Sequence, residues 1–364
     1  MKTLTAIWLA LLWLAAPVGA QETKLPLPLA MVGLEHDHAM GFIPELNRHP
    51  EVQLVGIVET NRDLIARYSA RFHFQTNMFF TSLDSLVTRT NVRAVATFTS
   101  IFAHREVVEA CARHGLDVMV EKPLAVNMQH ARAIADAAKK GGILVIVNYE
   151  TTWYPGNQLA FALVHDGQKI GRITKMVFHD GHQGPQEIGC STNFLAWLTD
   201  PVLNGGGALN DFGCYGADLA TWFLDGQRPV SVLAAMQHLK PQLYPKVEDD
   251  ATIVLTYPHT QVILQPSWAW PSNRKDMEIY GDAGRVLVPG PKQIKLMESK
   301  DQVEQDITAP PVASPNADPV SYFGAVVRRE IKPAGLSSLE VNLLVVEILE
   351  AAHRSANSGQ RIDF

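Results

Sequence analysis

Glu121, Lys122 and Pro123 directly follow a short apolar run, residues 118–120, which has the composition of a buried strand. In a parallel α/β sheet, the carboxyl ends of the strands border the ligand crevice. A lysine held rigidly there, with a carboxylate beside it, can orient or polarise a substrate hydroxyl group. A surface lysine at a strand exit is the competing interpretation, and these three residues alone do not decide between the two.

A second pair of polar residues lies in a glycine-rich segment, residues 204–222. Three glycines at 205–207 lead into a helical pattern in which Asp211 and Tyr215, four residues apart, share one helix face. Asp218 lies beside Tyr215 on the next turn. A carboxylate and a phenol on one face, next to a turn that lets a ligand approach, form a workable proton-transfer pair. A helix start with acids placed for its dipole is the competing interpretation.

Histidines form two further clusters, His36 with His38 and His179 with His182. Neither cluster shows a complete set of metal ligands, so we expect no metal site. His182 follows the first expected strand of the second half of the chain. We therefore expect it to contact the substrate, and it is the reserve candidate for acid–base catalysis.

The elements that must position these residues alternate between strand and helix in the first half of the chain. Apolar, strand-like segments are separated by amphipathic, helix-like ones, as in a parallel, doubly wound sheet. The expected strands are residues 28–33, 52–58, 92–98, 118–121 and 143–147, and the expected helices are residues 41–48, 62–70, 104–115 and 127–140, with a further helix starting at Ser82.

A doubly wound sheet of this kind binds a dinucleotide at a turn of the form G-x-G-x-x-G, and this turn is altered here. Gly33 keeps the first glycine, whereas Glu35 takes the second position and His38 the third. A side chain at the second position blocks close approach of the backbone to a phosphate. Glu35 also adds like charge unless its side chain turns away.

Glu59, at the end of the second expected strand, fits a dinucleotide better. A carboxylate there can accept hydrogen bonds from both ribose hydroxyls of adenosine, and it repels a 2′-phosphate. We therefore expect NAD rather than NADP, although Arg62 softens that repulsion. An ordinary acid at a strand end is the competing interpretation.

The second half of the chain changes pattern, because strand-like segments follow one another without helices between them. This indicates a mostly antiparallel sheet in a separate α+β domain. We expect a Rossmann-like domain over residues 21–148 and a second domain over residues 149–364, with the last helix, residues 338–355, packing back on the core.

Residues 1–20 have the features of a Sec-type signal peptide: a positive start, an apolar core and small residues before Gln21. We expect cleavage after Ala20, a periplasmic or secreted protein, and no membrane span after cleavage.

The net charge is −6 and the charges are dispersed, so we expect no nucleic-acid partner. With three cysteines in the chain, the apolar core must supply most of the stability.

Several separated stretches together resemble one family, the Gfo/Idh/MocA oxidoreductases. They are Glu121-Lys122-Pro123, the Gly-Gly-Gly-Ala-Leu-x-Asp-x-Gly-x-Tyr stretch at 205–215, and the end of the last helix at 355–360. The likeness covers essentially all of the chain after the leader, and the two central motifs together are fairly specific. The tyrosine form of the second motif is more similar to glucose–fructose oxidoreductase and dihydrodiol dehydrogenase than to inositol dehydrogenase.

The resemblance implies roles for individual residues. Lys122 would contact both the substrate and the nicotinamide ribose, and Asp211 and Tyr215 would form the Asp-x-x-x-Tyr pair. A free phenol has a pKa near ~10, so Tyr215 needs a neighbouring cation, for which Lys122 is the candidate. The loop from Thr97 to Ser100 would face the nicotinamide. The candidate cofactor-binding residues are Gly33, His36, His38, Glu59, Thr97, Thr99, Ser100, His104, Glu121 and Lys122.

These expectations describe an exported, nicotinamide-dependent oxidoreductase that acts on a sugar or glycoside hydroxyl and forms a homo-oligomer through its second sheet. Free nicotinamide nucleotides are scarce outside the cytoplasm, so we expect tightly held NAD and redox-neutral turnover, with His36 or His38 contacting the pyrophosphate. One alternative is a glycosidase or lyase that works through a transient keto-glycoside. Another is a sugar-binding protein whose nucleotide site has decayed.

Overall fold

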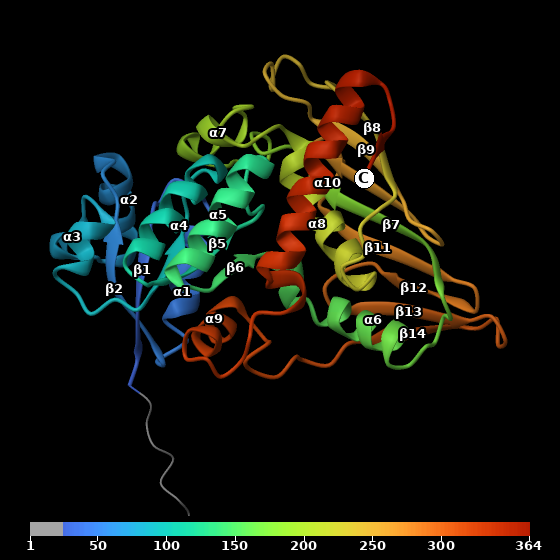
Figure 1. Cartoon of the computed structure of the whole chain (residues 1–364), viewed down its shortest axis with the longest axis horizontal. Helices are drawn as coiled ribbons and strands as arrows, with labels where there is room; N and C mark the ends of the chain where they lie inside the picture. The colour runs from blue at the N-terminus through green and yellow to red at the C-terminus, as the bar shows by residue number, and fades with distance from the viewer. Residues whose placement is uncertain (1–24) are drawn as a thin grey trace, which may run out of the picture.

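The computed structural model describes residues 25–364, in which two sheets lie side by side, each with its own helices (Figure 1). The expected signal peptide, residues 1–20, lies outside the described residues. No helix in the described part of the chain is long and apolar enough to cross a membrane.

The first sheet has six parallel strands in the order β3-β2-β1-β4-β5-β6, which confirms the doubly wound, Rossmann-like arrangement. The carboxyl ends of its strands therefore meet at one edge, where the strand order reverses between β1 and β4. The elements of this part are β1 (Leu27–Val32), α1 (Ala39–Leu46), β2 (Val52–Val58), α2 (Arg62–Phe72), β3 (Phe79–Phe80), α3 (Leu83–Val87), β4 (Ala94–Thr97), α4 (His104–Arg113), β5 (Asp117–Glu121), α5 (Met128–Gly141) and β6 (Val145–Asn148).

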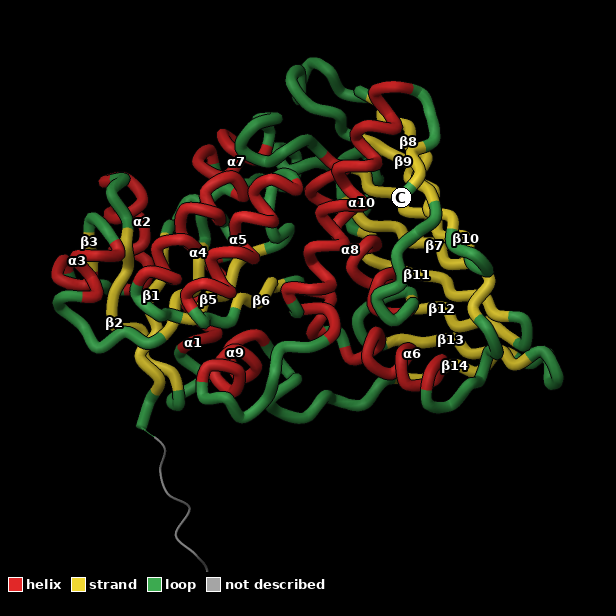
Figure 2. The backbone as a smooth tube through the Cα atoms, viewed as in Figure 1, coloured by secondary structure: helices red, strands yellow, loops and turns green. Residues whose placement is uncertain are grey.

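The second sheet has nine strands in the order β14-β13-β12-β11-β7-β10-β9-β8-β15, and only the β7–β10 pair is parallel. This confirms the mostly antiparallel second sheet. Figure 2 shows its strands as one curved layer, with α8 and α10 between it and the first sheet. The elements of this part are α6 (Pro155–His165), β7 (Ile173–Gly181), α7 (Thr192–Leu198), α8 (Ala208–Phe223), β8 (Ser231–Gln237), β9 (Asp250–Thr256), β10 (Gln261–Ser267), β11 (Arg274–Gly281), β12 (Gly284–Val288), β13 (Gln293–Glu298), β14 (Glu304–Thr308), α9 (Pro319–Val327), α10 (Leu339–Ser358) and β15 (Ile362–Asp363).

The glycine segment before α8 packs too closely for side chains. A Cβ atom at Gly207 would lie 1.9 Å from the carbonyl oxygen of Glu248, and Gly205 has a φ of +79°, which only glycine adopts at low cost. The Glu248 carboxylate accepts hydrogen bonds from the backbone N–H groups of Gly207 (2.7 Å) and Leu209 (3.1 Å). These contacts fix the start of α8, and with it the position of Asp211 in the first turn.

Helix α9 was not anticipated from the sequence. Although it follows the second sheet in the chain, its apolar residues Val320, Tyr322 and Phe323 belong to the same buried cluster as Leu29 and Met31 of β1. Figure 1 shows α9 beneath the first sheet, near α1. The last part of the chain therefore completes the core of the first sheet.

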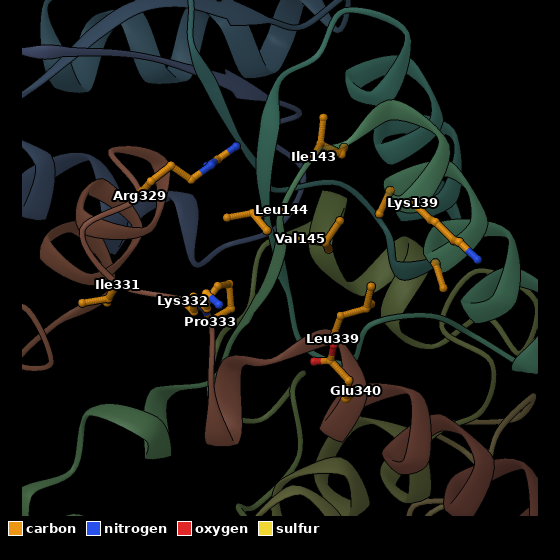
Figure 3. A pocket seen from close by; sticks show the side chains of 12 residues that line it. Lys139, Ile143, Leu144, Val145, Arg329, Ile331, Lys332, Pro333, Leu339 and Glu340 are labelled. Atoms are coloured by element: carbon orange, nitrogen blue, oxygen red, sulfur yellow. The ribbon is translucent and has the colours of Figure 1, made fainter.

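An apolar pocket of about 520 Å³ lies at the amino end of β6, between the end of α5 and the segment that joins α9 to α10 (Figure 3). Lys139, Lys332 and Glu340 are the charged residues among its lining besides Arg329. None of the residues expected to form the functional site lines this pocket. That site must therefore be sought at the opposite, carboxyl end of the strands.

Candidate active site

Lys122 and Asp211 come together as a buried ion pair between the two sheets. The Lys122 Nζ donates hydrogen bonds to the Asp211 Oδ1 atom at 2.6 Å and to the Asp211 backbone oxygen at 2.9 Å. The other carboxylate oxygen, Oδ2, accepts a hydrogen bond from the Trp268 indole N–H at 2.9 Å. Both charged residues are 6 % exposed. The two motifs that the sequence placed 89 residues apart thus form one cluster.

The two charges in this pair hold each other in the ionised state. Burial alone would lower the pKa of Lys122 and raise that of Asp211. The attraction between the ammonium and the carboxylate reverses both effects, so the pKa of Lys122 is raised and that of Asp211 is lowered. The ion pair therefore favours the charged form of Lys122, and Asp211 is engaged on both oxygens.

The ammonium groups of two lysines, Lys122 and Lys275, lie over the ring of Tyr215. Its ring centroid is 4.8 Å from the Lys122 Nζ and 4.6 Å from the Lys275 Nζ. The pKa of the phenol is nevertheless raised well above its usual value, because the side chain is buried and the carboxylates around it disfavour a second negative charge. The expectation that Lys122 would lower the pKa of Tyr215 is therefore wrong. Lys122 contacts the face of the ring, and burial outweighs its charge.

Lys275, on β11, was missed from the sequence, although it lies in the centre of this cluster. Its ammonium donates a very short hydrogen bond to the Glu150 carboxylate, which also accepts a hydrogen bond from the Tyr154 hydroxyl at 2.5 Å. Asp180, at the end of β7, is the residue paired with Lys275 in the β7–β11 register. A lysine in an antiparallel strand carries no local signal of function, because only the pairing register brings it to the site.

His182 follows β7 and lies against α8. Its ring makes an edge-to-face contact with Phe212 at 4.9 Å, and its Nδ1 atom accepts a hydrogen bond from the Gly184 backbone N–H at 2.9 Å. Burial lowers the pKa of His182, so the ring is neutral. Because Nδ1 accepts a hydrogen bond, the single ring proton is on Nε2. His182 therefore enters the site as a proton donor.

Glu59 organises the other end of the site. One carboxylate oxygen accepts a hydrogen bond from the Leu34 backbone N–H at 2.9 Å, and the other accepts hydrogen bonds from Thr60 and Asn61 at 2.8 Å each. The carboxylate thus joins the turn after β1 to the end of β2. It lies where a carboxylate can accept hydrogen bonds from the ribose of a dinucleotide.

The altered glycine turn after β1 still leaves backbone donors free, because the Glu35 side chain points away from it. Gly33 has a φ of +81°, and a Cβ there would lie 2.5 Å from the Thr99 methyl group. The Glu35 carboxylate turns away from the start of α1 and accepts a hydrogen bond from the Ser100 backbone N–H at 2.7 Å. Within residues 25–364, the backbone N–H groups of Glu35 and Asp37 donate to no atom. Two donors therefore remain at the turn for a pyrophosphate.

The two histidines of the turn differ in exposure. His36 is 1 % exposed and packs against Phe194 and Trp197 of α7, whereas His38 is exposed and its Nδ1 atom is hydrogen-bonded to Glu121 at 2.9 Å. His36, His38 and Glu121 could each direct one ligand atom to a metal ion. However, the His36 Nδ1 already accepts a hydrogen bond from the His38 backbone N–H at 3.2 Å. The absence of a metal site stays a prediction.

The loop after β4 lies against this turn. The Thr97 and Thr99 hydroxyls are 3.1 Å apart, and Ser100 binds Glu35 as described above. His104 is fully buried at the start of α4, and burial lowers its pKa to about 4. Its Nδ1 atom lies 3.2 Å from the Leu124 carbonyl oxygen. His104 therefore supports the turn after Glu121 from behind, and it does not face the crevice.

Two cavities lie along the carboxyl edge of the first sheet, and a third lies in the second domain and shares Glu150 with one of them. A slot of about 290 Å³ lies next to the end of β2 and includes Val58 and Ser82. A pocket of about 490 Å³ is lined by His38, Glu121 and Asn148, among others. A third, of about 290 Å³, is formed by residues of the second domain: Glu150, Tyr154, Gly181, His182, Phe212, Asn273, Arg274, Lys275, Asp276, Pro289, Gly290 and Pro291.

These features fit a dinucleotide with its nicotinamide end near Lys122. The slot beside β2 has room for a purine, Glu59 is placed for the adenosine ribose, and the Glu35 and Asp37 amides remain as donors for the pyrophosphate. The pocket at Glu121 lies at the other end of this path.

Comparison with known proteins agrees with this geometry. Residues 28–149 match the family described as "Oxidoreductase family, NAD-binding Rossmann fold", and residues 158–287 match "GFO/IDH/MocA C-terminal domain". The chain belongs to the Gfo/Idh/MocA family of oxidoreductases.

Several relatives of this family member have known activities or structures. A trans-1,2-dihydrobenzene-1,2-diol dehydrogenase of Xenopus laevis is 23% identical over 321 residues, which cover 85% of this chain and 92% of the relative. The aldose-aldose oxidoreductase of Caulobacter crescentus shares the fold with a TM-score of 0.80 at 22% identity, covering 93% of this chain and all of that chain. An inositol dehydrogenase homologue of Azotobacter vinelandii, solved with NAD+, has a TM-score of 0.79 at 19% identity, covering 95% and 99%. These matches support an enzyme that oxidises or reduces a sugar or polyol.

Proposed function

We propose that this family member oxidises and reduces a hydroxyl group of a sugar or glycoside with NAD that it holds tightly, and that each catalytic cycle is redox-neutral. The observation that carries the proposal is the cluster of Lys122, Asp211 and Tyr215, beside a crevice that ends at Glu59. The pocket of about 290 Å³ in the second domain, lined by His182, Phe212 and Lys275 among others, suits a ligand of monosaccharide size with hydroxyl groups.

Residues of the first domain would hold the cofactor. Glu59 would accept hydrogen bonds from the adenosine ribose, and the backbone N–H groups of Glu35 and Asp37 would donate to the pyrophosphate. When bound, the nicotinamide supplies a hydride acceptor and donor. Because the Glu59 carboxylate repels a 2′-phosphate, we propose NAD rather than NADP as the cofactor.

Residues of the second domain and the Lys122 turn would handle the hydroxyl group. The ion pair with Asp211 raises the pKa of Lys122, and the charged ammonium favours a substrate oxygen that gains negative charge. Tyr215 stays protonated, because burial raises its pKa. It therefore donates a hydrogen bond to that oxygen, and it supplies a proton when a carbonyl group is reduced.

The redox-neutral cycle and the site of action are parts of the same proposal. The aldose-aldose oxidoreductase, which shares this fold, is by name an enzyme with an aldose on both sides of its reaction. We propose export by the segment at residues 1–20 and action outside the cytoplasm, where an enzyme cannot rely on free NAD. We also propose that the second sheet forms the contact between copies in a homo-oligomer.

His182 favours one alternative, a glycosidase or lyase that oxidises its substrate only transiently. A neutral histidine with its proton on Nε2, beside the pocket in the second domain, can protonate a departing alkoxide. Net cleavage of a glycoside without accumulation of NADH would distinguish this reaction from exchange of hydride between two sugars.

The test begins with the purified mature protein in a native mass spectrum, followed by a denatured one. A mass excess equal to NAD in the first spectrum only would demonstrate a tightly held, non-covalent cofactor. NAD-loaded protein would then receive D-glucose, myo-inositol and p-nitrophenyl glucosides while nicotinamide absorbance and product sugars are followed. We expect transient reduction without net NADH. Accumulation of stoichiometric free NADH would contradict the redox-neutral cycle, and failure to bind NAD would contradict the enzymatic proposal as a whole.

A further inference from the structure

The pocket of about 490 Å³ at Glu121 lies between α1, the start of α9 and the ends of β5 and β6. Its acidic lining residues are Glu45, Glu121, Glu150 and Asp318. Phe42 and Trp153 add aromatic rings, and among residues 25–364 no lysine or arginine lines this pocket. Carboxylates and the faces of aromatic rings both attract cations. The lining therefore favours a ligand group that carries positive charge.

Glu121 is charged although it is buried. It is 1 % exposed, and one of its oxygens accepts a hydrogen bond from the Asn148 side-chain amide at 2.7 Å. The other oxygen lies 2.9 Å from the Nδ1 atom of His38, the histidine of the lining. Burial would raise the pKa of this carboxyl group, but His38, Asn148 and Lys122 together lower it. The ionised form of Glu121 is therefore the stable one.

Other cations reach the carboxylates of this pocket from outside its lining. Lys275 binds Glu150 from the pocket of the second domain, and it lowers the pKa of Glu150 against the effect of burial. The His49 ring lies 3.3 Å from both Glu45 and Asp318, but it is not part of the lining. A ligand in the pocket therefore meets the carboxylates before it meets these partners.

The pocket also adjoins the place where a substrate would react. Glu150 lines both this pocket and the one in the second domain. Glu121 is the last residue of β5 and directly precedes Lys122. A nicotinamide ring that exchanges hydride with a substrate in the second domain must lie next to that substrate. Of the two cavities along the edge of the first sheet, the one at Glu121 is therefore placed for this ring.

We propose that the carboxylates of this pocket make the protein bind NAD+ more tightly than NADH. This inference rests on the proposed function. The nicotinamide ring of NAD+ carries one positive charge, and the hydride that converts NAD+ to NADH removes this charge. The rest of the dinucleotide has the same charge in both forms. The ratio of the two affinities therefore reports how strongly the pocket attracts a charge at the ring.

Such a preference has a direct effect on the redox cycle. A tenfold preference for NAD+ would place the reduction potential of the bound couple about 30 mV below that of the free couple. Bound NADH is then a stronger reductant than free NADH, and it returns its hydride to a carbonyl compound more readily. The resting protein holds NAD+, which is the form that starts each redox-neutral cycle by oxidising a hydroxyl group.

The test is a competition between the two forms of the cofactor on the full mature chain. NAD-loaded protein is equilibrated with mixtures of NAD+ and NADH and separated from free nucleotide, and the nucleotides released on denaturation are quantified. Titration of the apo-protein with each form gives the individual affinities. We expect NAD+ to bind about tenfold more tightly than NADH, or more tightly still.

Two substitutions in the lining remove a charge and keep the shape of the side chain. Glu121→Gln retains an acceptor for the Asn148 amide, and Asp318→Asn retains one for the Ser321 N–H group. Each should lower the affinity ratio, about tenfold for Glu121→Gln, by weakening NAD+ and sparing NADH. Glu109→Gln, in an exposed ion pair on α4, is the control of equal charge change and should keep the wild-type ratio.

The ratio separates an effect of charge from an effect on structure. Loss of a structural contact would weaken NAD+ and NADH equally and leave the ratio unchanged. An unchanged ratio in Glu121→Gln and Asp318→Asn, or equal or tighter binding of NADH by the wild-type protein, would overturn this inference alone. If the wild-type protein binds neither form, the proposed function fails, and this inference fails with it.

Discussion

Lys122 and Asp211 join the two domains through one buried ion pair, because the lysine follows β5 of the first sheet and the aspartate lies in α8 beside the second. A buried pair of this kind contributes little net stability as a pair, but it is costly to break from one side. The same contact therefore matters for both catalysis and domain arrangement.

Lys122→Met should destabilise the protein by about 3–5 kcal/mol, because it leaves the buried Asp211 carboxylate without its cation. Adding Asp211→Asn should restore much of that loss, since the amide carries no charge. Urea unfolding of the two single variants and the double variant measures this coupling. Additive losses in the double variant would show that the two charges do not stabilise each other.

The same variant separates catalysis from cofactor binding. Lys122→Met should abolish turnover and keep NAD affinity, because the ammonium points toward α8 and away from Glu59. Nucleotide affinity is measured by titration of the apo-protein, and turnover by product sugars. If nucleotide affinity and turnover fell together, the main role of Lys122 would be to bind the cofactor.

Glu59→Gln should reduce the preference for NAD over NADP. The amide oxygen can still accept the hydrogen bonds from Thr60 and Asn61, whereas the Leu34 N–H group loses its acceptor and the charge that repels a 2′-phosphate is lost. Titration of wild-type and variant apo-protein with both nucleotides measures the ratio. Tighter binding of NADP by the wild-type protein would show that Glu59 does not set the preference.

Glu35→Gln should tighten NAD binding several-fold. Burial raises the pKa of Glu35, and its charge lies beside the turn that would receive a pyrophosphate. Glutamine keeps an acceptor for the Ser100 N–H group and removes the charge. Glu109→Gln, in an exposed ion pair on α4, is the control of equal charge change. Equal affinities of the Glu35 variant and wild type would mean that the phosphates bind elsewhere.

His49 should make the contact between α1 and α9 sensitive to pH. Its ring lies 2.9 Å from Glu51 and 3.3 Å from each of Glu45 and Asp318, the residue that caps α9. Burial opposes the charge, but these carboxylates raise the pKa of His49 above its ordinary value of 6.5. A raised pKa adds stability that is fully present below the ordinary value and is lost as pH rises through the folded-state value.

The measurement is a comparison of melting temperatures between about pH 6 and about pH 8. The wild-type protein should lose more stability over this interval than His49→Gln does, because only the wild type gives up a charged histidine. If the melting temperatures of the two proteins depended on pH in the same way, His49 would not be the source of the pH sensitivity.

Local sequence predicted what depends on neighbouring residues. Asp211 and Tyr215 lie on one helix because their spacing matches the helical repeat, and the polar stop after residue 120 marks the end of β5. The alternation of apolar and amphipathic segments likewise predicted the parallel sheet, and the succession of strand-like segments without helices between them in the second half predicted the antiparallel one.

Properties that depend on distant residues could not be predicted in this way. Lys275 and Trp268 reach the site through strand pairing and packing with segments far away in the chain. The pKa of Tyr215 depends on how deeply the folded protein buries it, and this outweighs the nearby cations. The direction of the Glu35 side chain depends on Ser100, which is 65 residues away.

Helix α9 has a consequence for the order in which the chain can fold. Until residue 327 has been synthesised, the face of β1 that holds Leu29 and Met31 lacks Val320 and Phe323, its last apolar cover. The Arg329 guanidinium, which binds the buried Asp117 carboxylate at 2.5 and 3.1 Å, arrives later still. The Rossmann-like half therefore lacks part of its core until the end of the chain has been synthesised. If the chain is exported unfolded, as proposed above, this delay would keep the nascent polypeptide competent for transport until it is nearly complete.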